Sequence, residues 1–350
     1  MPIPYDSLRA ILTHGFDTLI DVRSPAEFAT DHIPGAINLP ALSNAERAAV
    51  GTIYKQISPF RARKVGAALV ARNVAAHLDG PLADKDGGWR PLVYCWRGGQ
   101  RSGSFASILT QIGWRGDTVA GGYQSWRRLV HRALYDTPLP HRLILLDGYT
   151  GTAKTDILPR LAARGVQVID LEGLANHRGS LLGAMPEGQP EQRAFESALA
   201  VALDGLDPDR PVVVEAESSK IGRLVIPPMV WAAMTQAKRL VIDAPVAARA
   251  AYLTQAYSDV IADPAGLTAR LDALRQFRGH AVVDGWIALL GAQDFNGLSR
   301  ALIDQHYDAA YAKSRAAHDP TIAGTVRVET LDPAGQEGAA DRLAALIAGL

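Results

Sequence analysis

The fold is decided by residues 91–112, PLVYCWRGGQRSGSFASILTQI, where an apolar segment leads through glycines and arginines into a helical pattern. Pro91–Tyr94 predicts a buried strand, and the run from Gly103 to Ile112 predicts a helix. This order is typical of α/β domains with a parallel sheet covered by helices. Cys95 ends the strand, where backbone N–H groups converge at the helix N-terminus.

The same alternation extends on both sides of this stretch. Upstream, Thr18–Val22 predicts a strand, a helix opens at Ser24 and Pro25, residues 44–78 read as helical, and residues 79–90 read as a loop. Downstream, DTPLPHR at 136–142 places two prolines between a helix and a new strand, which predicts a domain boundary. We therefore expect two domains, residues 1–136 and 137–350.

The second domain also alternates strands and helices, which predicts another open α/β sheet. A helix is expected from the glycine-rich loop to about Arg164. Residues 246–318 look mostly helical, with an amphipathic helix closing the chain at Leu350. Strands are predicted at Leu143–Leu146, Gln167–Ile169, Val212–Val214, Leu240–Ile242 and Thr325–Val328.

Composition limits the classes of protein to consider. Among 350 residues, Lys plus Arg equals Asp plus Glu at 36 each, so any nucleic-acid surface has to be a local patch. No run of about 18 apolar residues and no leader is found, which predicts a cytoplasmic protein with no membrane partner. One cysteine excludes an intramolecular disulfide and a multi-cysteine zinc site, and we expect no bound metal.

Cys95 is the first candidate catalytic residue. The N–H groups of Gly98 and Gly99, the helix dipole, Arg97 and Arg101 would all favour its thiolate and hold an oxyanion. The alternative is an inert buried thiol.

Two flanking segments are similar to the rhodanese family: LIDVRSPAEFATDHIPGAINLP at 19–40 and GGYQSWR at 121–127. The resemblance covers most of residues 12–136. Cys95 and Arg101 are six positions apart, one more than in the common sulfurtransferase loop, so we expect a cradle large enough for phosphate or selenophosphate. Cysteine phosphatases share this spacing, but they usually carry histidine where Tyr94 stands.

A second loop, GYTGTAKT at 148–155, approximates the P-loop pattern G-x-x-x-x-G-K-[ST] between a strand and a helix. We expect it to bind a diphosphate through residues Gly148, Gly151, Thr152, Lys154 and Thr155. Ala153 replaces the second glycine, which puts ordinary ATP turnover in doubt because alanine resists positive φ. The alternative is a glycine-rich helix start without a ligand.

Acidic and other polar residues follow two predicted strands of this domain. Polar loops at the carboxyl edge of a parallel sheet are where ligands bind, and a carboxylate beside a P-loop commonly orients Mg²⁺. A capped surface turn and a solvated strand end are the alternatives. The candidate substrate-binding or supporting residues are Asp170, Glu172, Asn176, His177 and Arg178 in DLEGLANHRGS (170–180), and Glu215 and Glu217 in VVVEAE.

Taken together, C-W-R-G-G, the P-loop, DLEGLANHRGS, ESSKIGR at 217–223 and HYDAAYAKS at 306–314 closely resemble the tRNA 2-selenouridine synthase family. The resemblance covers essentially the whole chain. It implies a rhodanese-like domain followed by a P-loop domain with a helical C-terminal part. It also implies a selenium-carrying role for Cys95 and a diphosphate-binding role for the P-loop.

The resemblance further implies S-geranylation of wobble 2-thiouridine by geranyl diphosphate, then selenium transfer from selenophosphate through a cysteine perselenide. No tightly bound cofactor is expected, with Mg²⁺ as an optional ion. The partners would be thiolated tRNA and a selenophosphate supplier. Candidate tRNA contacts are Trp96, Arg127, Arg128 and Arg132, with His131 beside them, although a solvated helix face is equally compatible with the basic residues.

Two other functions fit the same motifs. The first is a rhodanese sulfurtransferase fused to an ATP-dependent, nucleotide kinase-like domain. The second is a non-enzymatic tRNA-binding regulator, against which the intact Cys95, Arg101, Lys154 and Thr155 argue.

Overall fold

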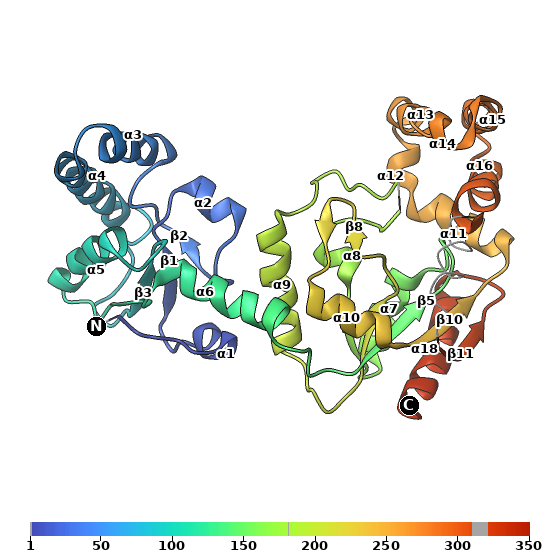
Figure 1. The fold of residues 1–350 in the computed structure, drawn as a ribbon, viewed down its shortest axis with the longest axis horizontal. Coiled ribbons are helices and arrows are strands. Elements are labelled where there is room, and N and C mark those ends of the chain that lie inside the picture. Colours follow the sequence, from blue (N-terminus) through green and yellow to red (C-terminus); the bar gives the residue numbers. More distant parts are fainter. Residues whose placement is uncertain (1, 181, 310–320) are drawn as a thin grey trace. The chain divides into compact units, whose positions relative to one another are not determined.

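A computed structural model describes residues 2–180, 182–309 and 321–350 of the chain. They form two compact units, each built on its own parallel sheet (Figure 1). Unit 1 comprises Met1–Pro138 with Pro190–Gly205, and unit 2 comprises Leu139–Gln189 with Leu206–Leu350. The α/β class with parallel sheets is confirmed. No helix in the described part of the chain is long and apolar enough to cross a membrane.

Unit 1 has a four-stranded parallel sheet in the order β2-β1-β3-β4. All four residues of β3 are buried, as an apolar strand covered on both faces requires. The strands are β1 (Thr18–Asp21), β2 (Ile37–Asn38), β3 (Pro91–Tyr94) and β4 (Asp117–Thr118). The helices are α1 (Leu8–Leu12), α2 (Pro25–Thr30), α3 (Asn44–Gln56), α4 (Pro59–Asp79), α5 (Gln100–Ile112), α6 (Gly122–His131) and the π-helix η1 (Arg132–Asp136).

The helical residues expected at 44–78 form two helices instead of one. Ser58 caps α4 by accepting a hydrogen bond from the Arg61 N–H, and Pro59 occupies the first turn. Proline is favoured at a helix start and breaks a helix that would run through it, so α3 ends before it.

Unit 1 also contains a helix that comes much later in the sequence, α9 (Gln192–Asp204). Trp126 of α6 donates a hydrogen bond to the Ser197 hydroxyl at 3.0 Å, and Arg127 forms an ion pair with Glu196. The Ser197 hydroxyl in turn donates to the Asp31 carboxylate at 2.9 Å. The division therefore differs from the expected 1–136 and 137–350, because residues 190–205 pack with the first unit.

Unit 2 has a five-stranded parallel sheet in the order β11-β10-β5-β7-β6. Its strands are β5 (Leu143–Asp147), β6 (Gln167–Ile169), β7 (Val212–Glu215), β10 (Lys238–Asp243) and β11 (Ile322–Arg327), with a separate hairpin β8 (Lys220–Ile221) and β9 (Leu224–Val225). The helices near the sheet are α7 (Lys154–Ala163), α8 (Leu171–Leu174), α10 (Pro228–Gln236), α11 (Val246–Ala256) and α18 (Pro333–Ala348).

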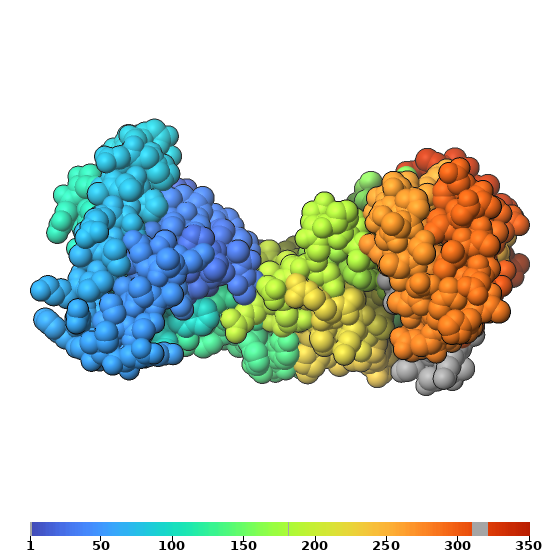
Figure 2. Space-filling view, turned by 90° about the horizontal axis from the view of Figure 1, so that it is seen from above, coloured from blue at the N-terminus to red at the C-terminus, as the bar shows by residue number. Residues whose placement is uncertain are grey.

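A helical region with its own apolar core completes unit 2, as expected for residues beyond 246. Its core surrounds the buried Trp286. In Figure 2 the helices α13 to α16 (orange) form one continuous lobe. The region comprises α12 (Ser258–Ile261), α13 (Pro264–Asp272), α14 (Arg275–Arg278), α15 (His280–Gly291), α16 (Phe295–Leu302) and the π-helix η2 (Ile303–Tyr307).

Candidate active sites

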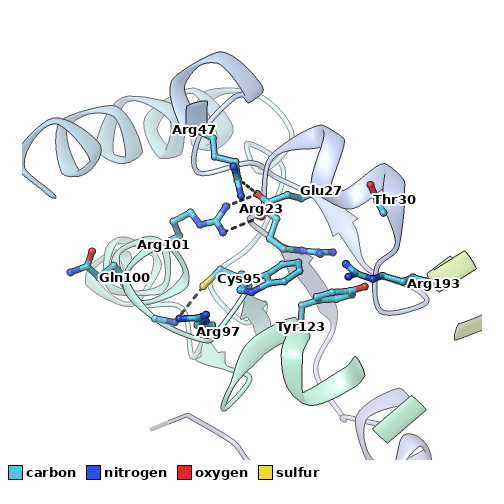
Figure 3. A pocket seen from close by; sticks show the side chains of 12 residues that line it. Arg23, Glu27, Thr30, Arg47, Cys95, Arg97, Gln100, Arg101, Tyr123 and Arg193 are labelled. Atoms are coloured by element: carbon cyan, nitrogen blue, oxygen red, sulfur yellow. Dashed lines mark hydrogen bonds and ion pairs between the residues drawn. The ribbon is translucent and has the colours of Figure 1, made fainter. Parts of the chain in front are cut away.

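Cys95 lies at the carboxyl end of β3, where the chain turns through Gly98 and Gly99 into α5 (Figure 3). Its Sγ accepts hydrogen bonds from the Gly99 N–H at 3.3 Å and from the Ser102 hydroxyl at 3.2 Å. Burial raises the pKa of the Cys95 thiol, but hydrogen bonds from Ser102 and Gly99 and the charge of Arg101 outweigh it. The pKa of the thiol is therefore lower than its ordinary value, which favours the nucleophilic thiolate.

Glycine is required where the turn packs against the segment before α6. Gly98 has φ +65°, and a Cβ there would lie 2.7 Å from the Val119 carbonyl oxygen. Gly122 has φ +56°, and its Cβ would lie 2.2 Å from the Cys95 carbonyl oxygen. The Tyr123 N–H donates to that same oxygen at 2.8 Å. The closing motif GGYQSWR thus packs against the backbone of the cysteine loop and stabilises its conformation.

The thiol opens into a cavity of about 720 Å³, which we call the cysteine cavity. Cys95 is only 4% exposed, so this cavity is its route to solvent. Besides Cys95 and Trp96 the lining is rich in guanidinium groups, and Figure 3 shows Arg97 and Arg101 beside the sulfur and Arg193 beyond Tyr123. The lining arginines are Arg23, Arg47, Arg97, Arg101 and Arg193.

One carboxylate, Glu27, orders part of this arginine group. It forms ion pairs with Arg101 at 2.8 Å and with Arg47 at 2.9 Å. Burial alone would raise the pKa of Glu27. The charges of Arg101 and Arg47 and the hydrogen bond from the Ser24 amide outweigh burial and lower the pKa to about 2. Glu27 therefore stays ionised and fixes the Arg101 guanidinium beside the thiol. Arg97 and Arg193, which do not pair with Glu27, add positive charge that makes the cavity suited to an anion.

Sequence reasoning missed several residues of this cavity. Arg23 was noted only as part of a motif, yet it lines the cavity while its guanidinium pairs with Asp21 at 2.6 Å. Arg47 and Arg193 come from α3 and α9, far from Cys95 in the sequence. No local pattern marks them; only the fold brings them to the thiol.

The proposed tRNA contacts have different environments. Trp96 lines the cysteine cavity, with its ring centre 5.3 Å from that of Tyr123. Arg127 is 18% exposed and forms ion pairs with Glu196 and Asp31, so it holds α9 and is not presented to a phosphate. Arg128 and Arg132 are exposed, although their guanidinium groups donate to the Ser125 hydroxyl and the Asp6 carbonyl.

The second candidate site is the P-loop of unit 2, which connects β5 to α7. Gly151 has φ +85° and packs against Leu253, to which a Cβ would approach within 2.9 Å. Ala153 adopts φ 58° and ψ 31°, in the left-handed region, and is buried. The loop therefore keeps the backbone conformation that normally calls for glycine, at a cost of about 1–2 kcal/mol.

The P-loop side chains form hydrogen bonds within the loop and to a neighbouring carboxylate. The Lys154 Nζ donates to the Gly148 carbonyl at 3.1 Å, and the Thr155 hydroxyl donates to the Glu172 carboxylate at 2.8 Å. Thr152 is buried, and its hydroxyl donates to the Tyr149 carbonyl. Glu172, from the DLEGLANHRGS segment, thus contacts the P-loop directly.

The two carboxylates of VVVEAE have separate positions. Glu215 is fully buried and accepts from the Leu171 N–H at 2.9 Å; burial and the nearby Asp170 raise its pKa well above the ordinary value. Glu217 lines the P-loop cavity defined below. Burial and Glu172 raise the pKa of Glu217 to about 8, against the opposing charge of Lys154.

The P-loop borders a cavity of about 1090 Å³, which we call the P-loop cavity. It combines polar residues with aromatic and aliphatic ones from α10 and α11. Seven of the predicted site residues line it: Gly151, Thr152, Lys154, Thr155, Glu172, Arg178 and Glu217. Within the described ranges, no group of three or more His, Cys, Asp and Glu residues is placed to hold a metal ion.

Other predicted residues lie outside the cavity lining and stabilise the DLEGLANHRGS segment through hydrogen bonds. Asn176 has φ +45° and donates to the Gly188 carbonyl at 2.7 Å. Burial lowers the pKa of the His177 imidazole, and the backbone N–H of His177 donates to the Glu172 carbonyl. Asp170 caps α8 by accepting from the Gly173 N–H. Of HYDAAYAKS, His306 and Tyr307 line the cavity, whereas residues 310–314 lie outside the described part.

Comparison with known proteins gives two family matches that follow one another in the sequence, and residues 190–205, which pack with unit 1, fall within the later match. The family model described as "tRNA 2-selenouridine synthase AAA domain" matches residues 141–284, and the one described as "Rhodanese-like domain" matches residues 5–129. These matches account for both candidate sites, because Cys95 lies in the second range and the P-loop in the first.

Curated relatives are also similar. A tRNA 2-selenouridine synthase of Aeromonas salmonicida is 38% identical over 68% of this chain and 64% of its own length, and that of Hahella chejuensis is 38% identical over 64% and 59%. The chain thus matches somewhat under two thirds of these two proteins. The synthase of Shewanella loihica is 35% identical over 73% of this chain and 68% of its own length. The chain belongs to the tRNA 2-selenouridine synthase family.

Proposed function

We propose that this protein replaces the sulfur of 2-thiouridine in tRNA with selenium, in two steps that use the two cavities. The observation that carries the proposal is that one chain of this family holds two cavities, one in each compact unit. One contains a thiol of lowered pKa among arginines, and the other contains a P-loop. Relatives of this family are named for the corresponding modification.

In the first step, the thiocarbonyl sulfur attacks C1 of geranyl diphosphate. The S–C bond forms as the C–O bond breaks, and diphosphate leaves with the electron pair. Lys154, the Thr155 hydroxyl and the loop amides would bind the leaving group and stabilise its developing charge. Alkylation converts a poor leaving group into a geranylthio group on an electron-poor carbon, which prepares the second step.

In the second step, the Cys95 thiolate displaces the geranylthio group from C2 of the base as geranylthiol, and the selenium of selenophosphate then displaces the Cys95 sulfur from C2. Hydrolysis of the Se–P bond releases phosphate and 2-selenouridine. Selenium in selenophosphate is already at the selenide level, so this route needs no oxidant, whereas a perselenide on Cys95 would need a two-electron oxidant to form and a thiol to release the product. The arginines of the cysteine cavity would hold the phosphate part of the donor. Trp96, which lines the same cavity, is available to stack on a base turned out of the anticodon. We infer no tightly bound cofactor, and Mg²⁺ would be an ion brought with the diphosphate.

Mass analysis of tRNA nucleosides tests this function. Thiolated tRNA is incubated with geranyl diphosphate and selenophosphate, with wild type, Cys95→Ala and Lys154→Ala compared. We expect Cys95→Ala to stop at the geranylated nucleoside, and Lys154→Ala to lose about a hundredfold or more of geranylation, as for a lost transition-state donor. Lys238→Ala, which removes an exposed lysine of the same unit, should match wild type.

Two results would contradict the proposal. Full selenation by Cys95→Ala would remove the assigned role of the thiol. Rapid ATP hydrolysis without tRNA, together with no use of geranyl diphosphate, would favour the sulfurtransferase–kinase function.

A further inference from the structure

A second, apolar cavity adjoins the P-loop cavity in unit 2, and we call it the apolar branch. Leu253, Tyr257 and Tyr307 line both cavities, so the two lie next to each other and share this wall. Apart from Ser299 and the two tyrosine hydroxyls, the side chains around the branch are hydrocarbon or aromatic. Its deeper wall consists of Leu182, Val260, Leu267, Phe295, Leu298 and Leu302.

The wall shared by the two cavities lies against the P-loop. Leu253 packs on Gly151, where a Cβ would come within 2.9 Å of the leucine Cγ. On the same shared wall, the Tyr257 hydroxyl is hydrogen-bonded to the Ser180 hydroxyl at 2.8 Å, and the Arg178 guanidinium lies 4.8 Å from the Tyr257 ring. The polar side of Tyr257 therefore belongs to the P-loop cavity, whereas its ring lines the branch.

We infer that the apolar branch binds the distal hydrocarbon end of the allylic diphosphate and sets the chain length that the protein accepts. This inference rests on the proposed function and assigns residues to its first substrate. A diphosphate on the P-loop leaves its prenyl chain within reach of Leu253, and an apolar chain gains free energy by leaving water. A small apolar site without charges suits no other part of the substrates.

The size of the branch supports a chain end and not a whole chain. It offers about 40 Å³ to water-sized atoms, while one water needs about 10–15 Å³ by that measure. The space therefore holds three or four heavy atoms, close to the branched end of one isoprene unit. The nearer carbons would remain in the larger P-loop cavity.

Another wall of the P-loop cavity suits a different group. Trp231, Met234 and Gln236 of α10 line it together with Arg239, whose guanidinium pairs with Asp147 at 3.0 Å. A hydrocarbon tail placed on that wall would desolvate polar side chains without pairing them, which costs free energy. The mixed wall is better matched to the nucleoside, so the tail is assigned to the branch.

Competition among allylic diphosphates of different length tests the inference. Leu298→Phe fills the branch, and Leu290→Phe is the matched control because Leu290 is buried in the same helical core outside the branch lining. Prenyl transfer to thiolated tRNA is measured with dimethylallyl, geranyl and farnesyl diphosphate. We expect Leu298→Phe to shift the kcat/KM ratio of geranyl to dimethylallyl by at least about tenfold toward the shorter donor. Leu290→Phe should leave the ratio unchanged.

The opposite substitution checks the result independently of folding defects. Phe295→Ala enlarges the branch and should shift preference toward farnesyl diphosphate. An unchanged chain-length ratio in both branch variants, or an equal change in Leu290→Phe, would overturn the inference while leaving the proposed function intact. A wild-type protein that used none of the three donors would instead overturn the proposed function, and the inference with it.

Discussion

The two cavities neutralise an anion in different ways. The cysteine cavity is lined by five arginines and one carboxylate, and the low pKa of Glu27, about 2, keeps that ion pairing unchanged over the working pH range. The P-loop cavity places Lys154 beside Glu172 and Glu217, and Glu217 has its pKa raised to about 8. The first site therefore has a fixed positive charge, whereas the charge of the second depends on proton binding.

The loops also differ in backbone chemistry. In the cysteine loop and its support, residues with positive φ, such as Gly98 and Gly122, are glycines. In the P-loop, Gly151 has positive φ but so does Ala153. The cysteine loop is thus held in a conformation free of side-chain strain, while the P-loop retains some strain. Three substitutions examine these two contrasts.

The largest effect is expected for Gly122→Ala behind the cysteine loop. The new Cβ would lie 2.2 Å from the Cys95 carbonyl oxygen and 2.5 Å from the Gly98 nitrogen, at φ +56°. Since both neighbours are backbone atoms, the loop itself has to move. We expect a loss of more than about 3 kcal/mol in the free energy of unfolding, measured with urea. Alkylation of Cys95 at pH 7 should slow in parallel.

Gly103→Ala is the matched control, because Gly103 lies in α5 with open space around it. Alanine is the better helix former, so this variant should be as stable as wild type or up to about 1 kcal/mol more stable. Similar stability of the two variants would show that Gly122 does not support the loop.

The local parts of both sites could be predicted from the sequence because their signals are short-range. A strand, a glycine turn and a helix N-terminus are adjacent in the chain, which is why Cys95 and the P-loop were identified. Arg47 and Arg193 could not be found this way, since each approaches Cys95 only through tertiary packing of α3 and α9. The packing of α9 with unit 1 could not be predicted for the same reason. Phe195 and Leu199 mark an apolar face of α9 in the sequence, but they do not show which unit covers that face.

For Glu215 and Glu217, the alternation of side chains along a strand does not predict which way each carboxylate points. Glu215 and Glu217 are two residues apart, which in a continuing strand places both side chains on one face. However, β7 ends at Glu215, so this alternation does not extend to Glu217. Glu215 is buried against α8, and Glu217 faces the P-loop cavity. The two carboxylates, which share one strand-end pattern in the sequence, therefore lie in different environments.

The second prediction concerns the titratable charge of the P-loop cavity. Below about pH 8 Glu217 is protonated, and above it a carboxylate repels the bound anion. We expect wild-type affinity for inorganic diphosphate to fall roughly threefold to tenfold more between pH 7 and 9 than that of Glu217→Gln, on the order of 1 kcal/mol. Isothermal titration calorimetry measures both, and the exposed Glu187→Gln should follow wild type.

The same group links stability to pH. The Glu217 carboxyl ionises near its ordinary pKa in the unfolded chain but only near 8 in the folded protein, so between these values the folded protein binds more protons. The contribution of Glu217 therefore lowers the free energy of unfolding as pH rises from about 5 to 8. Glu217→Gln should remove that contribution. Parallel pH profiles for the variant and wild type would mean that Glu217 is ionised throughout.

The smallest effect is expected for Ala153→Gly in the P-loop. Glycine removes about 1–2 kcal/mol of strain in the left-handed conformation, but its more flexible unfolded chain lowers the free energy of unfolding by about 0.5–1 kcal/mol. The net gain in the free energy of unfolding should therefore be about 1 kcal/mol or less. Ala162→Gly, at an exposed position of α7, should instead destabilise by about 0.5–1 kcal/mol, because it carries only the entropic cost. Opposite signs in urea unfolding would establish the strain at Ala153, and equal losses would show that the P-loop bears none.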